Sequence, residues 1–341
     1  LMLQKGYDCA GATMKLYDKP QCSQPGEKAC CTPSDTEDAR NVASRLGMLF
    51  YVFPMQEEFR RQVIDKFTAT YLNGGTPNPC IDCNRFLKFN ALLEKARELG
   101  MDYIVSGHYA RIEQDPDTGR FLLKKGLDHT KDQSYVLYSM TQDQLAHTIF
   151  PLGSYSKSEI RKIAQEQGFI NADKPDSQDI CFVPDGDYAS FIQSYTGNTP
   201  QPGDFVDKEG HVLGKHKGHI HYTIGQRRGL GISAPQSLYV CSKSLKDNQV
   251  VLGLPEDLMS DSCLVGDINL ISWDRLDHPV QCKVKTRYRQ PEQPATIEQI
   301  GDDRIRVTFQ EPQRAVTPGQ AAVFYDGDTV LGGGTILAEN A

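Results

Sequence analysis

The sequence predicts an α/β protein with a parallel sheet in its first half and an all-β second half. Up to about residue 175, apolar strand-like segments alternate with amphipathic helical segments, a pattern typical of βαβ units. From about residue 200, short alternating segments are separated by Gly and Asp turns, which favours a small barrel or sandwich. We expect the boundary within the stretch "YTGNTPQPGD", residues 195–204.

The composition is that of an ordinary water-soluble protein. The chain has 341 residues, 39% of them apolar and 24% charged, enough for two or three domains. The sequence contains no apolar run long enough for a membrane helix and no secretory leader, so we expect a cytoplasmic protein without membrane contact. In a reducing compartment, its ten cysteines point to packing, metal binding or catalysis rather than a disulfide framework.

The chain opens on what reads as the end of a helix. "LMLQKG" resembles a last helical turn closed by Gly6, and "YDCAGATM" then reads as a strand. Because a helix end without a beginning suggests upstream residues, we interpret the sequence as N-terminally truncated.

The next elements alternate in type. "TPSDTEDARNVASRLG" carries Thr32 or Ser34 as a cap and Pro33 in the first turn, and "LFYVF" follows as a strand. A second helix ends at Gly100, before the strand "MDYIVSG" and the capped helix "SKSEIRKIAQEQG". The apolar residues that indicate the second helix recur at helical spacing: Phe86, Phe89, Leu92, Leu93, Ala96 and Leu99.

Four segments of the second half read as strands with turns: 203–218, 279–290, 295–309 and 320–337. If the segment 279–290 is one strand, the alternating cations Lys283, Lys285, Arg287 and Arg289 lie on one face. A second basic segment holds Lys215, Lys217, Arg227 and Arg228 near four histidines. The net charge of −7 argues against a general nucleic-acid coat, but these two segments favour local binding of phosphates.

Two cysteines stand three apart in "GGTPNPCIDCNRFLKF", residues 74–89. A structural zinc site needs a second ligand pair at similar spacing, whereas Cys30 and Cys31 are adjacent and Cys22 is isolated. The proline-rich approach does not fit a thioredoxin-like switch. Cys83 at the start of a helix would gain thiolate character, which favours a nucleophile, although burial of both sulfur atoms beneath the loop is an equal alternative.

A third cysteine lies in a polar loop. Cys181 in "KPDSQDICFVPDGD" is flanked by Asp176, Asp179 and Asp185. Such a loop is a poor place to bury a structural thiol, and loops of an α/β layer are where sites are assembled. Cys181 therefore joins Cys80 and Cys83 as a candidate site residue.

Six ordered motifs resemble the tRNA-specific 2-thiouridylases of the bacterial and organellar type. They are "GTPNPCIDCNRFLKF", "SGHYARI", "GLDHTKDQSYVLY", "DSQDICF", "HYTIGQRRGLGI" and "TRYRQ". The resemblance runs from the first residues to about Gln320. It implies a PP-loop ATP pyrophosphatase-like thiolation domain over 1–198, a central tRNA-binding domain over 199–258 and a C-terminal β-barrel over 259–341.

The resemblance also implies a reaction. ATP, with Mg²⁺, adenylates the C2 oxygen of the wobble uridine at position 34 of tRNA. An upstream sulfur carrier protein delivers a persulfide to Cys181, and its terminal sulfur is transferred to C2. Cys83 is the partner thiol, which attacks the persulfide and leaves a Cys83–Cys181 disulfide.

The remaining site residues follow from the same motifs. Met14 and Gly107 are similar to the ATP contacts of the family. The positions similar to its tRNA contacts are Asn78, Pro79, Cys80, His108, Lys131, Asp132, Gln133, Arg287, Tyr288 and Gln320.

Two departures from the family pattern leave alternatives open. The phosphate-binding motif S-G-G-x-D-S is not within these residues, and "LGGGTIL" at 331–337 is no substitute because no helix follows it. Cys80 stands where many members have aspartate, so Cys80, Cys83 and Cys181 could instead hold an iron–sulfur cluster that carries the sulfide. An alternative of another class is a redox protein or a non-catalytic tRNA-binding protein.

Overall fold

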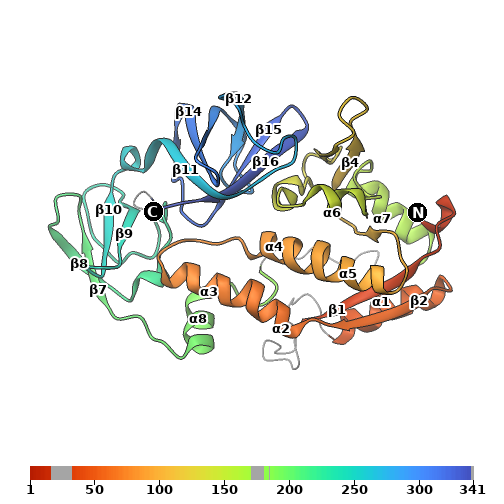
Figure 1. The fold of residues 1–341 in the computed structure, drawn as a ribbon. Coiled ribbons are helices and arrows are strands. Elements are labelled where there is room, and N and C mark those ends of the chain that lie inside the picture. The colour runs from red at the N-terminus through yellow and green to blue at the C-terminus, as the bar shows by residue number, and fades with distance from the viewer. Residues whose placement is uncertain (17–32, 170–179, 184, 339–341) are drawn as a thin grey trace. The chain divides into compact units, whose positions relative to one another are not determined.

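The computed structural model describes residues 1–16, 33–169, 180–183 and 185–338 (Figure 1). The chain forms two compact units. The first comprises Leu1–Ile64 and Pro79–Asp187, and the second comprises Asp65–Asn78 and Tyr188–Ala341. Cys22, Cys30, Cys31, Asp176 and Asp179, as well as the predicted cap Thr32, lie outside the described residues.

Parallel strands joined by helices form the predicted α/β part of the first unit. Strand β1 (Ala10–Lys15) pairs in parallel with β2 (Leu49–Pro54), and helix α1 (Pro33–Arg45) lies between them in the chain. A second parallel pair joins β3 (Ile104–Val105) to β6 (Thr148–Ile149). The predicted helix end is confirmed as the single 3₁₀ turn η1 (Leu3–Lys5), which Gly6 closes at φ 83°.

The helices around the cysteine pair form two continuous runs, and each run contains a π-helical segment. The first consists of α2 (Gln56–Phe59), the π-segment η2 (Arg60–Ile64) and α3 (Asp65–Leu72). The second consists of α4 (Pro79–Asp82), the π-segment η3 (Cys83–Ala91) and α5 (Leu92–Glu98).

The π-segment changes the helical face expected from the sequence. A π-turn closes i→i+5 rather than i→i+4, so the buried positions leave the α-helical period. Leu87 and Phe89 are completely buried, whereas Phe86 is half-buried and Leu99 is exposed. The predicted helix that stops at Gly100 is confirmed, because α5 ends at Glu98, but Phe86 and Leu99 are not buried with Phe89.

Capped helices and a hairpin complete the first unit. Strands β4 (Ala110–Gln114) and β5 (Phe121–Lys125) form an antiparallel hairpin, and the 3₁₀ segment η4 (Ser134–Leu137) follows. Helices α6 (Gln142–Ala146) and α7 (Lys157–Glu166) both begin with a capping box. The α7 box confirms the predicted capped helix.

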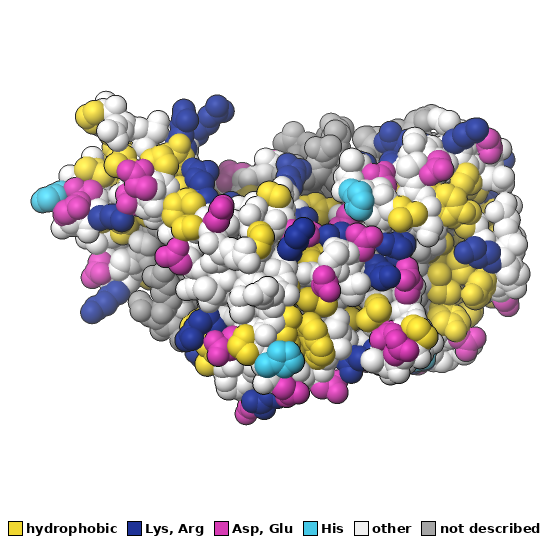
Figure 2. Space-filling model, turned by 90° about the horizontal axis from the view of Figure 1, so that it is seen from above, with side chains coloured by type: hydrophobic (Ala, Val, Ile, Leu, Met, Phe, Trp, Pro, Cys, Tyr) yellow, Lys and Arg dark blue, Asp and Glu magenta, His cyan; other side chains and the backbone are white. Residues whose placement is uncertain are grey.

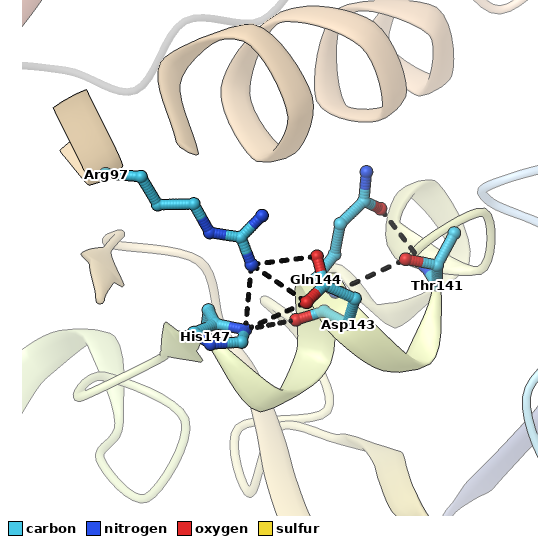
Figure 3. Close-up of polar contacts among 5 residues, drawn as sticks. All are labelled: Arg97, Thr141, Asp143, Gln144 and His147. Atoms are coloured by element: carbon cyan, nitrogen blue, oxygen red, sulfur yellow. Dashed lines mark hydrogen bonds and ion pairs between the residues drawn. The ribbon is translucent and has the colours of Figure 1, made fainter. Parts of the chain in front are cut away.

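Helix α5 is connected to α6 by the polar contacts shown in Figure 3. One terminal guanidinium nitrogen of Arg97 contacts both carboxylate oxygens of Asp143, at 2.8 and 2.9 Å. The same nitrogen lies 3.2 Å from Nδ1 of His147. All three side chains are exposed, so this network contributes more to the orientation of the helix than to stability.

The second unit begins with helices and a small sheet. Helix α8 (Tyr188–Thr196) packs aromatic rings on α3, with Phe67 and Tyr188 at 6.1 Å between centroids. The sheet has the order β8-β7-β10-β9. Its strands are β7 (Gly203–Val206), β8 (Val212–His216), β9 (Tyr239–Ser244) and β10 (Gln249–Gly253), with short helices η5 (His219–His221) and η6 (Pro255–Leu258) beside them.

The C-terminal part is a closed six-stranded barrel in the order β11-β14-β13-β12-β15-β16, and β11 pairs with β16 to close it. Its strands are β11 (Met259–Leu270), β12 (Val280–Lys285), β13 (Gln293–Ile300), β14 (Arg304–Arg314), β15 (Ala321–Asp326) and β16 (Thr329–Ile336). The core includes Val284, Ile297, Val307 and Phe324. The structure selects the barrel over the sandwich and confirms the predicted fold class.

Within the described residues, none of the helices combines the length and the apolar character needed to cross a membrane.

Candidate active site

The first two candidate thiols lie on the same helical run. Helix α4 begins at Pro79, which is buried, so Cys80 lies in the first turn and Cys83 opens the π-segment η3. Cys80 is exposed and Cys83 is half-buried, and both are thiols. The expectation that Cys83 stands at the helix start is therefore wrong. The unpaired N-terminal amides belong to the first four residues of the helix, so they favour the thiolate form at Cys80 more than at Cys83.

The third thiol lies beside two buried apolar residues. Cys181 is half-buried, whereas Phe182 and Val183 are 2% and 1% exposed. The Phe182 ring meets Phe59 of α2 edge-to-face, with 5.7 Å between the centroids. The segment is thus held by its neighbours in sequence while the sulfur-bearing side chain stays accessible.

The same helix contacts both cysteine segments. Phe182 packs on α2, and α2 also contacts η3, the segment that Cys83 begins. Its continuation η2 contacts both α4 and η3. The segments that carry Cys80, Cys83 and Cys181 therefore all contact the continuous helix formed by α2 and η2 in the first unit.

The predicted Lys131–Gln133 segment is tied to the predicted Gly107–His108 turn. Gln133 accepts a hydrogen bond from the Tyr109 amide at 3.0 Å through its side chain and donates to the Tyr109 carbonyl at 2.9 Å through its own amide. Asp132 accepts hydrogen bonds from the Ser134 hydroxyl at 2.8 Å and from the Gly126 amide at 3.1 Å. Asp132 and Gln133 therefore shape the segment that presents Lys131.

His108 is a buried, neutral histidine. Its side chain lies between the rings of Phe89 and Phe150, at 5.6 and 5.7 Å between centroids, and Nδ1 is 2.7 Å from the Ser106 hydroxyl. Burial, together with nearby Lys88, lowers the pKa of His108 to about 3. Its predicted contact with RNA stays a prediction, and its side chain serves the core.

Met14 and Gly107 lie at the carboxyl ends of parallel strands. Met14 is near the end of β1, and Gly107 follows β3 after one residue. Open α/β sheets bind nucleotides at this edge. Gly107 is exposed, and a Cβ placed there would make an ordinary van der Waals contact at 3.5 Å with a side-chain carbon of Leu152. Both positions fit a nucleotide site.

Arg287 and Gln320 of the second unit make internal contacts. One terminal guanidinium nitrogen of Arg287 donates to the Thr317 hydroxyl at 2.7 Å, to the Ala315 carbonyl at 3.0 Å and to the Ile224 carbonyl at 3.1 Å. The Gln320 amide donates to the Thr76 carbonyl at 2.8 Å, two residues before Asn78. Both side chains brace the turn at 315–320, and their predicted tRNA contacts stay predictions.

The predicted cationic face of 279–290 is only partly formed. Strand β12 ends at Lys285, and residues 286–290 turn, because the Gln290 amide donates to the Arg287 carbonyl at 3.2 Å. Lys283 and Lys285 share a face, and Lys285 lies over the ring of Tyr288 at 5.7 Å. Arg287 and Arg289 do not continue this face, so the prediction is wrong beyond the strand end.

The other basic segment is also partly internal. His216 is 1% exposed, with Nδ1 accepting from the Gly218 amide at 3.0 Å and Nε2 donating to the Asn248 carbonyl at 3.1 Å. Lys215 pairs with Asp204 at 2.7 Å. In Figure 2, basic and acidic side chains are interspersed over the displayed face rather than separated by sign.

Metal-ligating groups are clustered at one place in the described part of the chain. Asp207, Glu209 and His211 place their donor atoms within 4.8 Å of one another at an exposed turn. Cys80, Cys83 and Cys181 do not form a group of this spacing among the described residues.

Sequence reasoning missed Asn84. This residue directly follows Cys83, is 1% exposed and donates from Nδ2 to the Val136 carbonyl at 2.9 Å. A signal was present, because a polar residue stands one turn before the buried Leu87 on the helix.

Three family models match the chain. They are described as a tRNA methyl transferase HUP domain over residues 1–185, a tRNA methyl transferase PRC-barrel domain over 189–254 and an aminomethyltransferase beta-barrel domain over 260–336. The fold therefore defines a HUP-domain protein with two further β domains.

Curated relatives make the family specific. The tRNA-specific 2-thiouridylase MnmA of Carboxydothermus hydrogenoformans is 48% identical over 338 residues, which cover 98% of this chain and 92% of that protein. The protein of the same name from Clostridioides difficile is 48% identical over 336 residues, covering 98% of this chain and 93% of that protein. The chain belongs to the tRNA-specific 2-thiouridylase family.

Proposed function

We propose that this protein is a tRNA uridine 2-sulfurtransferase that converts the wobble uridine at position 34 into 2-thiouridine. The main support is the 48% identity, over 98% of the chain, to relatives named tRNA-specific 2-thiouridylases. Both the Cys83 segment and the Cys181 segment contact helix α2, which is consistent with two thiols that act in one reaction.

In the proposed reaction, Cys181 carries the sulfur. The Cys181 thiolate attacks the outer sulfur of a persulfide held by a carrier protein, so that Cys181 becomes a persulfide and the carrier's own sulfur leaves as a thiolate. The terminal sulfur attacks C2 of the activated uridine and displaces AMP. The Cys83 thiolate then attacks Sγ of Cys181, which forms the Cys83–Cys181 disulfide and releases the thiolated base. A dithiol reductant returns both cysteines to the thiol form.

The C2 oxygen of uridine attacks the α-phosphorus of ATP, which forms the adenylate and releases pyrophosphate; Mg²⁺ would neutralise the charge of the phosphates. Met14 and Gly107 would contact the nucleotide from the carboxyl ends of β1 and β3. Their backbone groups would orient it, because β1 and β3 are fixed by their parallel partners.

Each unit, taken by itself, offers candidate contacts for tRNA. Lys131 is presented by a segment that Asp132 and Gln133 hold in shape, and Lys283 and Lys285 share one face of β12. Tyr288, 39% exposed, could stack on a base. The target uridine must leave its stack to reach the cysteines. We propose that the reaction takes place in the cytoplasm. We also propose three domains, which cover residues 1–198, 199–258 and 259–341.

A second route uses an iron–sulfur cluster. Cys80 is exposed and lies three residues before Cys83 on the same helical run, so both thiols can face one side. With Cys181 as a third ligand, the cluster would keep one iron available for the sulfide. Cys80 separates the two routes, because the persulfide reaction needs only Cys83 and Cys181.

The test is thiolation of unmodified tRNA by the full-length protein, purified without oxygen and supplied with ATP and a persulfide donor. Cys83→Ala and Cys181→Ala should each abolish 2-thiouridine formation, whereas Cys282→Ala in the barrel should leave it unchanged. If Cys80→Ala retains full activity and no iron co-purifies, the cluster route is wrong. Thiolation by Cys181→Ala would refute the persulfide assignment.

A further inference from the structure

The side chain of Asn84 is enclosed directly behind Cys83. Asn84 is 1% exposed, and Nδ2 donates to the carbonyl oxygen of Val136 at 2.9 Å. The other end of the amide, Oδ1, is buried and has no hydrogen-bond partner among the described residues.

Chemistry permits only this orientation of the amide. A flipped side chain would place Oδ1 against the Val136 carbonyl, where two acceptors would repel one another. Nδ2 must therefore face Val136, and Oδ1 is the end of the amide that has no partner among the described residues.

Stability does not explain an amide at this position. One neutral hydrogen bond contributes less to stability than a buried acceptor without a partner costs. A leucine of similar shape would avoid that cost and would extend the buried face of Leu87. What the amide provides and leucine cannot is a directional contact between η3 and η4.

That contact connects Cys83 to the predicted tRNA segment. Val136 lies in η4, and its amide donates to the Gln133 carbonyl at 3.1 Å. Gln133 in turn holds Tyr109 through two hydrogen bonds, at 2.9 and 3.0 Å. A continuous series of hydrogen bonds therefore runs from the residue after Cys83 to the residue after His108.

We infer that Asn84 is a positioning residue for Cys83. Its amide fixes the first turn of η3 against η4, so that the Cys83 thiol keeps a defined position relative to the Lys131–Gln133 segment. This inference rests on the proposed function, in which Cys83 must meet the Cys181 sulfur in line. Small errors in such a geometry lower rates strongly, because nucleophilic attack depends on the alignment of the reacting atoms.

The decisive variant is Asn84→Leu, which keeps volume and removes the directional contact. We expect kcat at saturating tRNA to fall about tenfold or more, while KM for tRNA stays within about twofold. The melting temperature should be unchanged or higher. In the tRNA-free protein, the alkylation rate of Cys83 by iodoacetamide, read by peptide mass spectrometry, should change about threefold or more.

Asn90→Leu is the matched control, because Asn90 is an exposed asparagine of the same π-segment. It should match the parent in kcat and in Cys83 alkylation. Asn84→Ala is the second variant: it removes the donor to Val136 without adding bulk or charge, so Cys83 alkylation should change again even if Asn84→Leu fails to fold.

Wild-type kcat together with wild-type Cys83 alkylation in Asn84→Leu would overturn the inference, and so would unchanged alkylation in Asn84→Ala. The two levels of proposal fail separately. If the parent protein does not thiolate tRNA, the proposed function is wrong, whereas the alkylation rates still decide the role of Asn84.

Discussion

Gln320 donates a hydrogen bond from its side-chain amide to the carbonyl oxygen of Thr76, with 2.8 Å between the atoms. The Thr76 amide donates back to the Pro318 carbonyl at 2.9 Å, so the loop and the turn exchange hydrogen bonds. Gly319 fits this approach with φ +88°, since a Cβ there would come within 3.0 Å of the Thr76 nitrogen. Gln320 therefore holds the loop that leads to Asn78.

Gln320→Ala should lower the free energy of unfolding of the tRNA-free protein by about 1 kcal/mol, the usual contribution of one such hydrogen bond. Urea denaturation measures it. Gln313→Ala is the control, because the hydrogen bond of that amide is exposed and local, to the Glu311 carbonyl of its own strand. Unchanged stability combined with weaker tRNA binding would show that Gln320 acts as an RNA contact instead.

Phe182→Leu should loosen the segment that carries Cys181. The smaller side chain gives up part of the contact with Phe59, at a cost of roughly 1–3 kcal/mol. We expect faster alkylation of Cys181 and slower formation of its persulfide, both read by mass spectrometry. Phe309→Leu in the barrel core is the control for general destabilisation, and equal changes at Cys181 in both variants would contradict the prediction.

His108 should make the protein less stable in acid. Its folded pKa is lowered to about 3 by burial, whereas the unfolded chain takes up the proton near its ordinary pKa. The stability that depends on neutral His108 is therefore fully present above about pH 6.5 and is lost progressively as the pH falls towards 3. At pH 5 the loss is about 2 kcal/mol.

Urea denaturation of His108→Gln at pH 7 and pH 5 tests this dependence. The variant should lose less stability between the two pH values than the parent, by about 2 kcal/mol. His278→Gln, at an exposed site, should behave as the parent does. The same pH dependence in parent and His108→Gln would mean that His108 accepts a proton while folded.

Lys243 should destabilise the second unit at neutral pH. Its ammonium nitrogen is buried without a hydrogen-bond partner among the described residues, and desolvation lowers the pKa of Lys243 to about 8. Since the unfolded lysine titrates near 10.5, stability should increase as the pH rises from 8 to 10.5, and the cost is complete below 8.

Lys243→Met should therefore stabilise the protein at pH 7, by roughly 1–3 kcal/mol. The melting temperature should rise accordingly. Lys217→Met replaces an exposed lysine of the same domain and should leave it unchanged. A fall in the melting temperature of Lys243→Met would show that the ammonium group has a stabilising partner.

Local patterns determined most of the fold. Ser156 and Glu159 form the capping box expected before α7, Gly6 closes the first turn, and the alternating segments after residue 200 became strands. Each of these features depends on neighbours within a few residues, and such neighbours are visible in a sequence. The motifs likewise singled out Cys83 and Cys181.

Tertiary structure alone decided how the site residues are used. The sequence did not predict that the cysteine helix begins at Pro79 or that it contains a π-segment. It also did not predict that the guanidinium of Arg287 points inward or that the amide of Asn84 is buried. Arg287 contacts carbonyl groups 28 and 63 residues away, and Asn84 one that is 52 residues away. Periodicity carries no information about such partners, because packing brings them together after the local elements have formed.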